Sequence, residues 1–304
     1  MSPTLRAHLA LSAVALIYGA NYVIAKTVMP DPIDPNAFIA LRVLGAVILF
    51  WLISYRHVTI PERADWLRII LCGMTGVAIN QLFFFNGLSL TSPLNSAIIM
   101  TSNPIMVMLI AAWILRSPLS SKKITGVILG TAGAVSILLM SSMDKSVHSS
   151  ALGDTFILIN SLSYAFYLVL VKPLMKKYHP LNVITWVFTA GLIMVLPFGG
   201  TGLYAVDWGV LTTWQWFAVG YVIVFVTFMT YLLNILALSI VSSTTASAYI
   251  YFQPLLAGVF SWLFSMILDS PVHNDFTLLK GVFTLMIFIG VYLVSIADAS
   301  KAKV

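Results

Sequence analysis

The sequence predicts an all-α polytopic membrane protein with ten transmembrane helices, and three observations lead to this fold class. Of its 304 residues, 60% are hydrophobic and only 9% are charged, whereas soluble domains carry about 25% charged residues. Apolar runs of about 20 residues recur along the chain, and each is long enough to cross about 30 Å of hydrocarbon as a helix. These runs do not alternate between apolar and polar residues, so a transmembrane barrel is excluded.

Turn-forming residues separate the predicted spans, and no segment has the composition of a separate soluble domain. The first run is longer than the apolar core of a signal peptide, so we interpret it as a retained helix. The predicted spans are 5–28, 36–55, 66–89, 93–115, 122–141, 151–174, 180–199, 212–238, 242–268 and 276–297.

The distribution of Lys and Arg predicts the orientation of the chain. Twelve of these residues fall on one predicted side of the membrane and three on the other, with Arg42 inside a span. Cytoplasmic loops are enriched in basic residues, so both termini are predicted to be cytoplasmic. The same loops account for the net charge of +6, which argues against nucleic-acid binding. Short loops without glycosylation sequons favour a multi-pass protein of the bacterial inner membrane.

The chain resembles a duplication of two five-helix units, residues 1–141 and 142–304. Equivalent positions carry the same residue: Tyr18 and Lys26 match Tyr164 and Lys172, and Pro104 matches Pro254 at an offset of 150. Because five is an odd number, the second unit enters the membrane from the opposite side. Such a 5+5 inverted repeat permits two related conformations that open to opposite sides. The alternative is a duplicated scaffold without transport.

Several motifs resemble the EamA family of the drug/metabolite transporter superfamily. They are Tyr18-Gly19-Ala20-Asn21-Tyr22 followed by Lys26, Leu41-Arg42-Val43, Thr91-Ser92-Pro93-Leu94-Asn95-Ser96-Ala97 and Gly153-Asp154. The resemblance covers both halves of the chain. It implies a ten-helix inverted-repeat carrier, often an exporter of amino acids or related metabolites. Gln253 stands where some relatives carry Glu, so a role for that carboxylate is not transferred.

The positions of the acidic residues bear on ion coupling. All ten Asp and Glu residues fall in predicted loops or at the ends of spans. Proton-coupled carriers generally use an ionisable group within the membrane. We therefore expect export or exchange down a gradient, without an intramembrane carboxylate for ion coupling.

Polar residues at helical spacing mark the faces that would line a shared chamber. Interhelical hydrogen bonding, worth about 0.6–2 kcal/mol per contact, is the competing interpretation for each of them. Aromatic rings and neutral amides suit a small amphiphilic substrate such as an amino acid with an apolar side chain, and no cofactor or metal is expected. The predicted lining residues are Tyr18, Asn21, Tyr22, Asn80, Gln81, Phe84, Asn95, Asn103, Tyr164, Tyr167, Tyr231, Tyr249 and Gln253.

Three basic residues are candidates for a charge contact or a gate. Arg42 lies inside the second span, where it either braces a helix and reaches toward the surface or contacts a substrate carboxylate. Lys26 and Lys172 lie at the end of the first span of each half. The simplest interpretation is that their side chains extend toward the membrane surface. Their matched positions also permit a gating role.

Two further patterns bear on partners and on rival functions. Gly126, Gly130 and Gly133 form a stripe typical of close helix packing, which we assign to contacts within a monomer rather than to a dimer. An intramembrane enzyme is the first rival class, but the chain lacks HExxH and GxSxG motifs. Its S-x-x-K sequence, Ser120 to Lys123, lies in a predicted loop. A membrane scaffold or a channel is the other rival.

Overall fold

The computed structural model describes residues 2–91, 93–116, 119–141, 150–267 and 278–299, and their regular structure is entirely helical. Helical segments cover each predicted span, with end points that differ by a few residues. The α-helices are α1 (Pro3–Ile24), α2 (Pro35–Ser54), α3 (Trp66–Gly73), α4 (Ile79–Leu90), α5 (Pro93–Met100), α6 (Asn103–Ile114), α7 (Ser121–Ser141), α8 (Ala151–Lys177), α9 (Pro180–Gly199), α10 (Gly202–Ala205), α11 (Thr213–Tyr221), α12 (Thr230–Leu238), α13 (Ser243–Ala248), α14 (Gln253–Ile267) and α15 (Leu278–Ala299).

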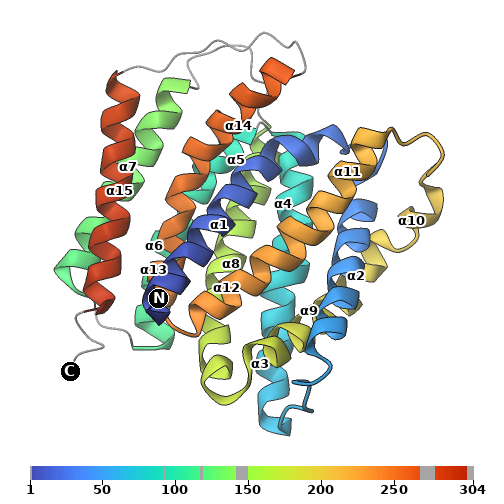
Figure 1. The fold of residues 1–304 in the computed structure, drawn as a ribbon, viewed down its shortest axis with the longest axis horizontal. Coiled ribbons are helices and arrows are strands. Elements are labelled where there is room, and N and C mark those ends of the chain that lie inside the picture. The colour runs from blue at the N-terminus through green and yellow to red at the C-terminus, as the bar shows by residue number, and fades with distance from the viewer. Residues whose placement is uncertain (1, 92, 117–118, 142–149, 268–277, 300–304) are drawn as a thin grey trace.

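Six helical segments of the described chain are long and apolar enough to cross a membrane. They are Pro3–Thr27, Pro35–Ser54, Arg63–Leu90, Ala151–Lys177, Pro180–Gly199 and Thr213–Leu238. Figure 1 shows that the first residues of α1 and the last turns of α15 lie at the same end of the bundle, together with the α2–α3 and α8–α9 connections. The fold is therefore that of a polytopic helical membrane protein.

Four of the predicted spans contain interruptions of the α-helical hydrogen-bonding pattern. The stretch before Pro104 separates α5 from α6, and the 3₁₀ segment η5 (Tyr249–Phe252) precedes Pro254 between α13 and α14. The π-helical segments η3 (Met74–Ala78) and η4 (Val222–Met229) link α3 to α4 and α11 to α12. Proline removes a backbone donor and favours such breaks, whereas π-bulges are frequent at functional sites.

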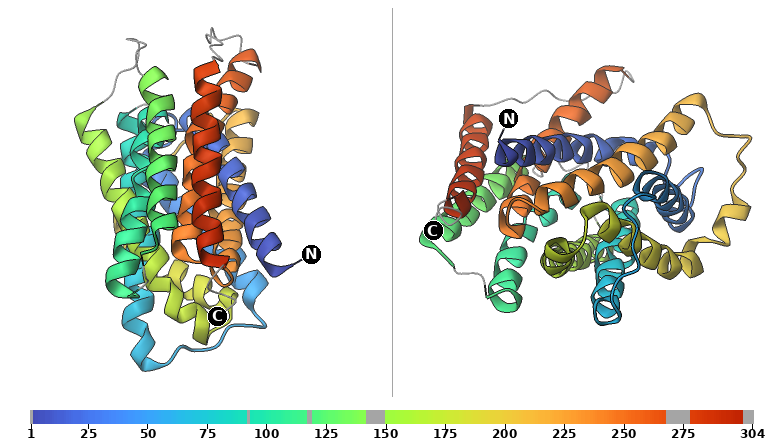
Figure 2. Two further views of the ribbon diagram at one scale, coloured as in Figure 1. Left: turned by 90° about the vertical axis from the view of Figure 1, so that its left-hand side faces the viewer. Right: turned by 60° about the horizontal axis from the view of Figure 1, so that its bottom comes forward.

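Helices α7 and α15 lie side by side, as Figures 1 and 2 show, and glycine residues lie at their contact. A Cβ atom at Gly126 would lie 2.7 Å from the carbonyl oxygen of Gly290. A Cβ atom at Gly133 would lie 2.7 Å from the carbonyl oxygen of Phe283. The predicted glycine stripe therefore makes a contact within the chain, because only glycine allows the two backbones to approach this closely.

Replacing Gly290 with leucine is expected to destabilise this pair of helices by about 1–3 kcal/mol, since backbone atoms of α7 leave no room for a side chain. A Cβ at Gly290 would lie 2.7 Å from both the Gly126 oxygen and the Gly130 nitrogen. Gly258→Leu is the matched control, because a Cβ there meets nothing within 4 Å. Thermal unfolding in detergent tests this: equal midpoints for the two variants would contradict the packing described.

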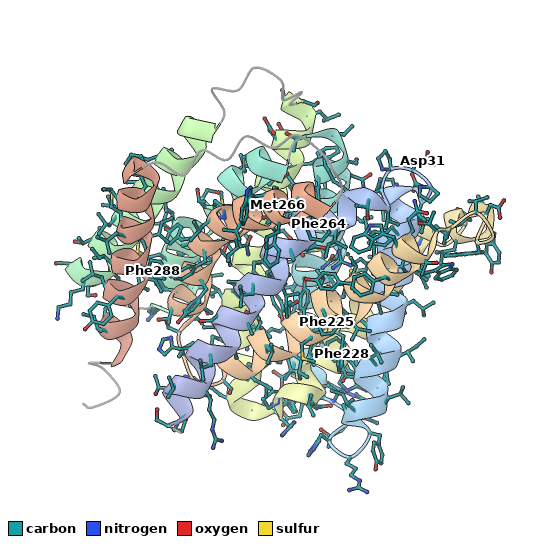
Figure 3. The ribbon with its side chains drawn as sticks, turned by 45° about the horizontal axis from the view of Figure 1, so that its top comes forward. Asp31, Phe225, Phe228, Phe264, Met266 and Phe288 are labelled. Carbon is teal, nitrogen blue, oxygen red and sulfur yellow. The ribbon has the colours of Figure 1, made fainter. Side chains whose placement is uncertain are left out.

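The outer surface of the bundle is apolar. Phe225, Met266 and Phe288, which Figure 3 labels, are each about half exposed. Large exposed hydrophobic side chains also line the outer faces of α1 and α2. Contiguous apolar surface of this extent suits contact with lipid.

At the end that carries the first residues of α1, polar contacts join two connections. Lys177 at the end of α8 forms ion pairs with Glu62 at 2.5 Å and Asp65 at 2.7 Å. The rings of His57 and His179 stack with their centroids 4.1 Å apart. The Nδ1 atom of His179 also accepts a hydrogen bond from the Leu181 N–H at the start of α9.

Protonation of His179 is expected to weaken this end of the protein. Partial burial and the neighbouring His57 ring lower the pKa of His179 below 6.5. The unfolded chain therefore binds the proton more readily, so stability is fully present above about pH 6.5 and declines as the pH falls below it. His179→Asn, which keeps a side-chain cap, should show a smaller loss of the unfolding midpoint between pH 8 and pH 5. An equal loss would contradict the assignment.

Candidate functional site

A central cavity lies between the helices. Both halves of the sequence contribute to its wall. Its lining residues are Tyr18, Asn21 and Tyr22 of α1, Arg42 of α2, Asn80, Gln81, Phe84 and Phe85 of α4, Met100 of α5, Asn160 and Tyr164 of α8, Val226 of η4, Tyr231 of α12, Ile250 of η5 and Gln253 of α14.

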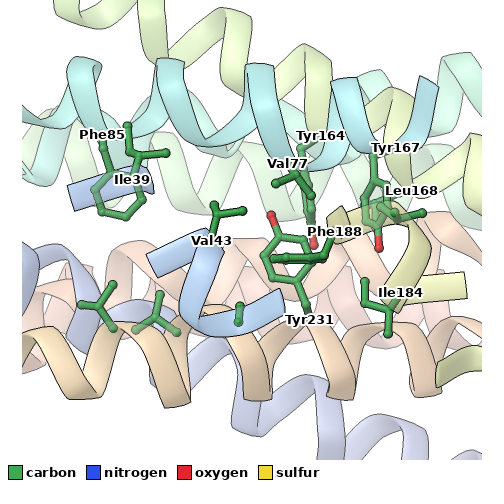
Figure 4. Packing of buried hydrophobic residues seen from close by; sticks show 14 of the residues in the cluster. Ile39, Val43, Val77, Phe85, Tyr164, Tyr167, Leu168, Ile184, Phe188 and Tyr231 are labelled. Atoms are coloured by element: carbon green, nitrogen blue, oxygen red, sulfur yellow. The ribbon is translucent and has the colours of Figure 1, made fainter. Parts of the chain in front are cut away.

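Tyr231 organises one wall of the central cavity. Its hydroxyl donates to the carbonyl oxygen of Gly76 at 2.7 Å, accepts from Gln81 Nε2 at 2.8 Å and lies 3.0 Å from Asn80 Oδ1. Figure 4 shows its ring packed near Val43 and Phe188, with the hydroxyl end toward the helical segment that carries Val77. The π-helical segment η3 thus presents a backbone carbonyl to a side chain of α12. This wall is held by a satisfied polar network.

A second cavity adjoins the first and extends toward the beginning of α1. It is lined there by Leu11, Val14 and Ala15, and on the opposite helices by Ser247 and Tyr249. The two cavities share four lining residues, which form a partition: Tyr18, Tyr164, Ile250 and Gln253.

Two hydrogen bonds tie α1 to the interrupted segment between α13 and α14. The Tyr22 hydroxyl donates to Gln253 Oε1 at 2.9 Å on the side of the central cavity. His8 Nδ1 lies 2.7 Å from the Tyr249 hydroxyl on the side of the second cavity. Movement between α1 and this segment would therefore break one contact at each cavity.

Arg42 is the charged side chain in the wall of the central cavity. It is 2% exposed, its Nε donates to Thr227 Oγ1 at 2.8 Å, and its Cζ lies 4.0 Å from the centroid of the Phe85 ring. Its Nη1 atom has no hydrogen-bond partner. Placing arginine at a helix centre costs about 2.5–3.5 kcal/mol on insertion scales, and an unmade hydrogen bond to a charged group adds to that cost.

Two amide oxygens of the same cavity also lack partners. They are Oδ1 of Asn21 on α1 and Oδ1 of Asn160 on α8. Asn160 is fixed because its Nδ2 donates to the carbonyl oxygen of Asn80 at 2.7 Å. Three residues in the cavity wall thus each carry a buried polar atom without a partner, one cationic donor and two amide acceptors, although buried polar atoms are generally paired.

The structure brings most of the predicted residues to these cavities. Of the predicted lining residues, the central cavity contains Tyr18, Asn21, Tyr22, Asn80, Gln81, Phe84, Tyr164, Tyr231 and Gln253, together with Arg42, and the second cavity contains Tyr249. Tyr167 and Asn103 are buried but line neither cavity: Tyr167 packs where a Cβ at Gly76 would lie 2.4 Å away, and Asn103 donates to the Ser161 carbonyl at 2.6 Å. The side chain of Asn95 lies outside the described residues.

Lys26 and Lys172 line neither cavity, and they make matched backbone contacts. The Nζ atom of Lys26 donates to the carbonyl oxygen of Thr91 at 2.8 Å, just beyond α4. Lys172 Nζ donates to the carbonyl oxygens of Leu238, the last residue of α12, and of Val241, just beyond it. Each lysine therefore binds carbonyl groups at the C-terminal end of a helix, where positive charge is favourable.

The sequence did not single out four apolar lining residues, Phe85, Met100, Val226 and Ile250. They lie in segments that are apolar throughout, so the sequence does not distinguish a cavity-lining residue from its apolar neighbours. Asn160 had a weaker signal, since it shares a helical face with Tyr164. Only the three-dimensional arrangement identifies the four apolar residues as lining.

Two of the described acidic residues make contacts at the ends of helices. Asp34 Oδ1 accepts from the Asn36 N–H at 2.9 Å and so caps α2. Asp154 Oδ1 accepts from the Thr91 hydroxyl at 2.6 Å. The S-x-x-K sequence has a similar structural use, because Ser120 Oγ accepts the Lys123 N–H at the start of α7. Neither cavity has a carboxylate among its lining residues.

Comparison with known proteins assigns this architecture to a family. The model of the EamA-like transporter family matches residues 5–139 and again residues 151–296. The chain belongs to the EamA-like transporter family. A solved crystal structure with 14% sequence identity superposes with a TM-score of 0.71 and covers 97% of this chain and 98% of its own. That similarity establishes the shared fold.

Curated relatives of this EamA-like transporter come from distant organisms. An uncharacterized transporter of Archaeoglobus fulgidus is 25% identical, over 95% of this chain and 96% of its own length. The uncharacterized transporter YetK of Bacillus subtilis is 25% identical, over 94% of this chain and 83% of its own. A chloroplastic WAT1-related protein of Arabidopsis thaliana is 22% identical over 93% of this chain. The chain is therefore an integral, multi-pass membrane transporter.

Proposed function

We propose that this EamA-like transporter exports small amphiphilic metabolites, such as amino acids or related compounds, by alternating access. The observation that carries the proposal is the pair of cavities separated by a partition of Tyr18, Tyr164, Ile250 and Gln253. A substrate in the central cavity would reach the second cavity only when these residues move apart. Alternating access requires such a barrier on one side of the site at a time.

Matched irregularities in the two halves support ten spans in a 5+5 inverted repeat. The breaks before Pro104 and Pro254 are 150 residues apart, and the π-helical segments η3 and η4 occur in the third and eighth spans. Lys26 and Lys172 add the matched contacts described above. Exchanging the conformations of two such halves would reverse the side to which the cavity opens.

The basic end of the bundle is the proposed cytoplasmic side. It carries the first residues of α1 and the connections around Arg63 and Lys177, and the positive-inside rule places such an end in the cytoplasm. The second cavity is then the inner one. We further propose that the protein lies in a bacterial inner membrane and acts as a monomer. Its two five-helix repeats are residues 1–141 and 142–304.

The chemistry of the lining favours transport without ion coupling through a carboxylate. Rings and neutral amides surround the central cavity, and the acidic residues of the described chain lie elsewhere. A substrate that presents an apolar surface and a few hydrogen-bonding groups fits this lining.

Metabolite profiling followed by reconstitution tests the proposal. Cells that overproduce the protein should accumulate a specific external metabolite, and that metabolite should cross liposome membranes with saturable kinetics. Unlabelled substrate on the far side should accelerate the flux if the substrate-loaded carrier reorients across the membrane faster than the empty carrier. Non-saturating flux would indicate a channel, and uphill accumulation driven by a pH gradient alone would contradict uncoupled transport.

A further inference from the structure

We infer that Arg42 binds the carboxylate of the transported molecule, so that the central cavity selects monoanions and zwitterions and rejects organic cations. The inference rests on the proposed function, because it concerns the ligand of the same cavity. It assigns to one residue the charge selectivity that the family match leaves open.

The charge of the cavity supports this assignment. Its lining contains one guanidinium group and no carboxylate, and arginine stays protonated in proteins. Asp34 and Asp154, the acidic residues nearest along the chain to α2 and to the Asn160 segment, are used at helix ends. A bound carboxylate would neutralise Arg42, whereas a bound cation would place a second positive charge in a site of low dielectric constant.

The contacts of Arg42 fix its orientation but leave part of it unused. Thr227 Oγ1 accepts from Nε, and that threonine is itself held because its hydroxyl donates to the Val222 carbonyl at 2.7 Å within the π-helical segment. Phe85 supports the guanidinium from one face. Nη1 then remains without a partner. A residue that served only to brace helices would be expected to have its donors paired, as buried polar groups generally are.

The unpaired amide oxygens extend the description of the ligand. Asn21 and Asn160 offer acceptors in the same cavity, and acceptors bind an N–H or O–H group of the ligand. Phe84, Phe85 and Met100 supply apolar surface. The ligand that satisfies these groups together is a carboxylate with an amino or hydroxyl group nearby and an apolar remainder.

Three probes that share a phenyl group separate charge from apolar contact. They are 3-phenylpropionate (an anion), phenylalanine (a zwitterion) and 2-phenylethylamine (a cation). Binding to the purified full-length protein in lipid nanodiscs can be followed by tryptophan fluorescence or by calorimetry at pH 7. We expect the anion and the zwitterion to bind about 30-fold or more tightly than the cation, the size of a charge-assisted hydrogen-bonded pair.

Variants identify the residue responsible. Arg42→Gln should abolish the preference for the two carboxylates, and Arg42→Lys, which keeps the charge but loses the fork of donors, should restore part of it. Arg68→Gln is the matched control, since Arg68 is exposed and outside both cavities. A preference that persists in Arg42→Gln, equal binding of the three probes, or no binding of any of them would overturn the inference.

The flux experiment keeps this inference distinct from the proposed function. Charge-selective binding that is lost in Arg42→Gln, in a protein without saturable flux, would refute the carrier and retain the role of Arg42. Saturable, accelerated exchange with no difference between anion and cation would retain the carrier and refute the role of Arg42.

Discussion

Tyr231→Phe is expected to reduce transport at least tenfold in protein that still folds. Removing the hydroxyl leaves Gln81 Nε2 and the Gly76 carbonyl without their partner, and each unmade buried hydrogen bond costs about 1–3 kcal/mol. The two amides of Asn80 and Gln81 would then reorient in the wall of the central cavity. Initial flux, normalised to the amount of monodisperse protein, is the quantity to measure.

The control for this variant is Tyr221→Phe. Tyr221 also loses a hydrogen bond, from its hydroxyl to the Ile17 carbonyl at 3.0 Å, but it lines neither cavity. Its flux should stay within about twofold of the wild-type value. If Tyr231→Phe behaved in the same way, the network would be structural and not part of the transport site.

Gln253→Glu is the second substitution with a large expected effect, because it places a carboxylate in the cavity that contains Arg42. An ionised Glu would compete with the substrate for Arg42, so flux of a carboxylate substrate should fall at least tenfold at pH 8.

Gln253→Leu separates charge from hydrogen bonding. It leaves the Tyr22 hydroxyl without its acceptor and introduces no titrating group, so its flux should be reduced at every pH. Tyr22→Phe breaks the same hydrogen bond from the other side. If the two losses do not add in the double variant, the residues act as a pair. A Gln253→Glu variant that loses no more flux than Gln253→Leu would contradict the electrostatic account of the cavity.

The helices could be predicted from the sequence because hydropathy and turn-forming residues act locally. Pro35 begins α2 and Pro180 begins α9 at the positions where their spans were expected. The π-helical segments could not be predicted, since a shift of hydrogen-bond partners within an apolar helix leaves no mark on composition. The short helix α10 could not be predicted either, because four residues are too few to show a helical periodicity of hydrophobic residues.

The candidate site was partly predictable for a related reason. Asn80, Gln81 and Gln253 stood out as amides in apolar spans, where exposure to lipid is costly, and they line the central cavity. Tyr167 has the same type of signal but packs against Gly76 instead. For Arg42 the sequence left bracing and ligand binding as alternatives. Which donors of its guanidinium are paired depends on Thr227, a residue 185 positions away.

Reciprocal accessibility of the two cavities is the most direct test of the account. Cys72 is the single cysteine of the chain, so a Cys72→Ser background allows one new thiol at a time. Met100→Cys probes the central cavity and Ser247→Cys the second, each with a membrane-impermeant thiol reagent applied from one side. We expect the two thiols to react from opposite sides, and a saturating substrate to change their rates in opposite directions. Reaction of both thiols from the same side, or rates that change together, would contradict alternating access.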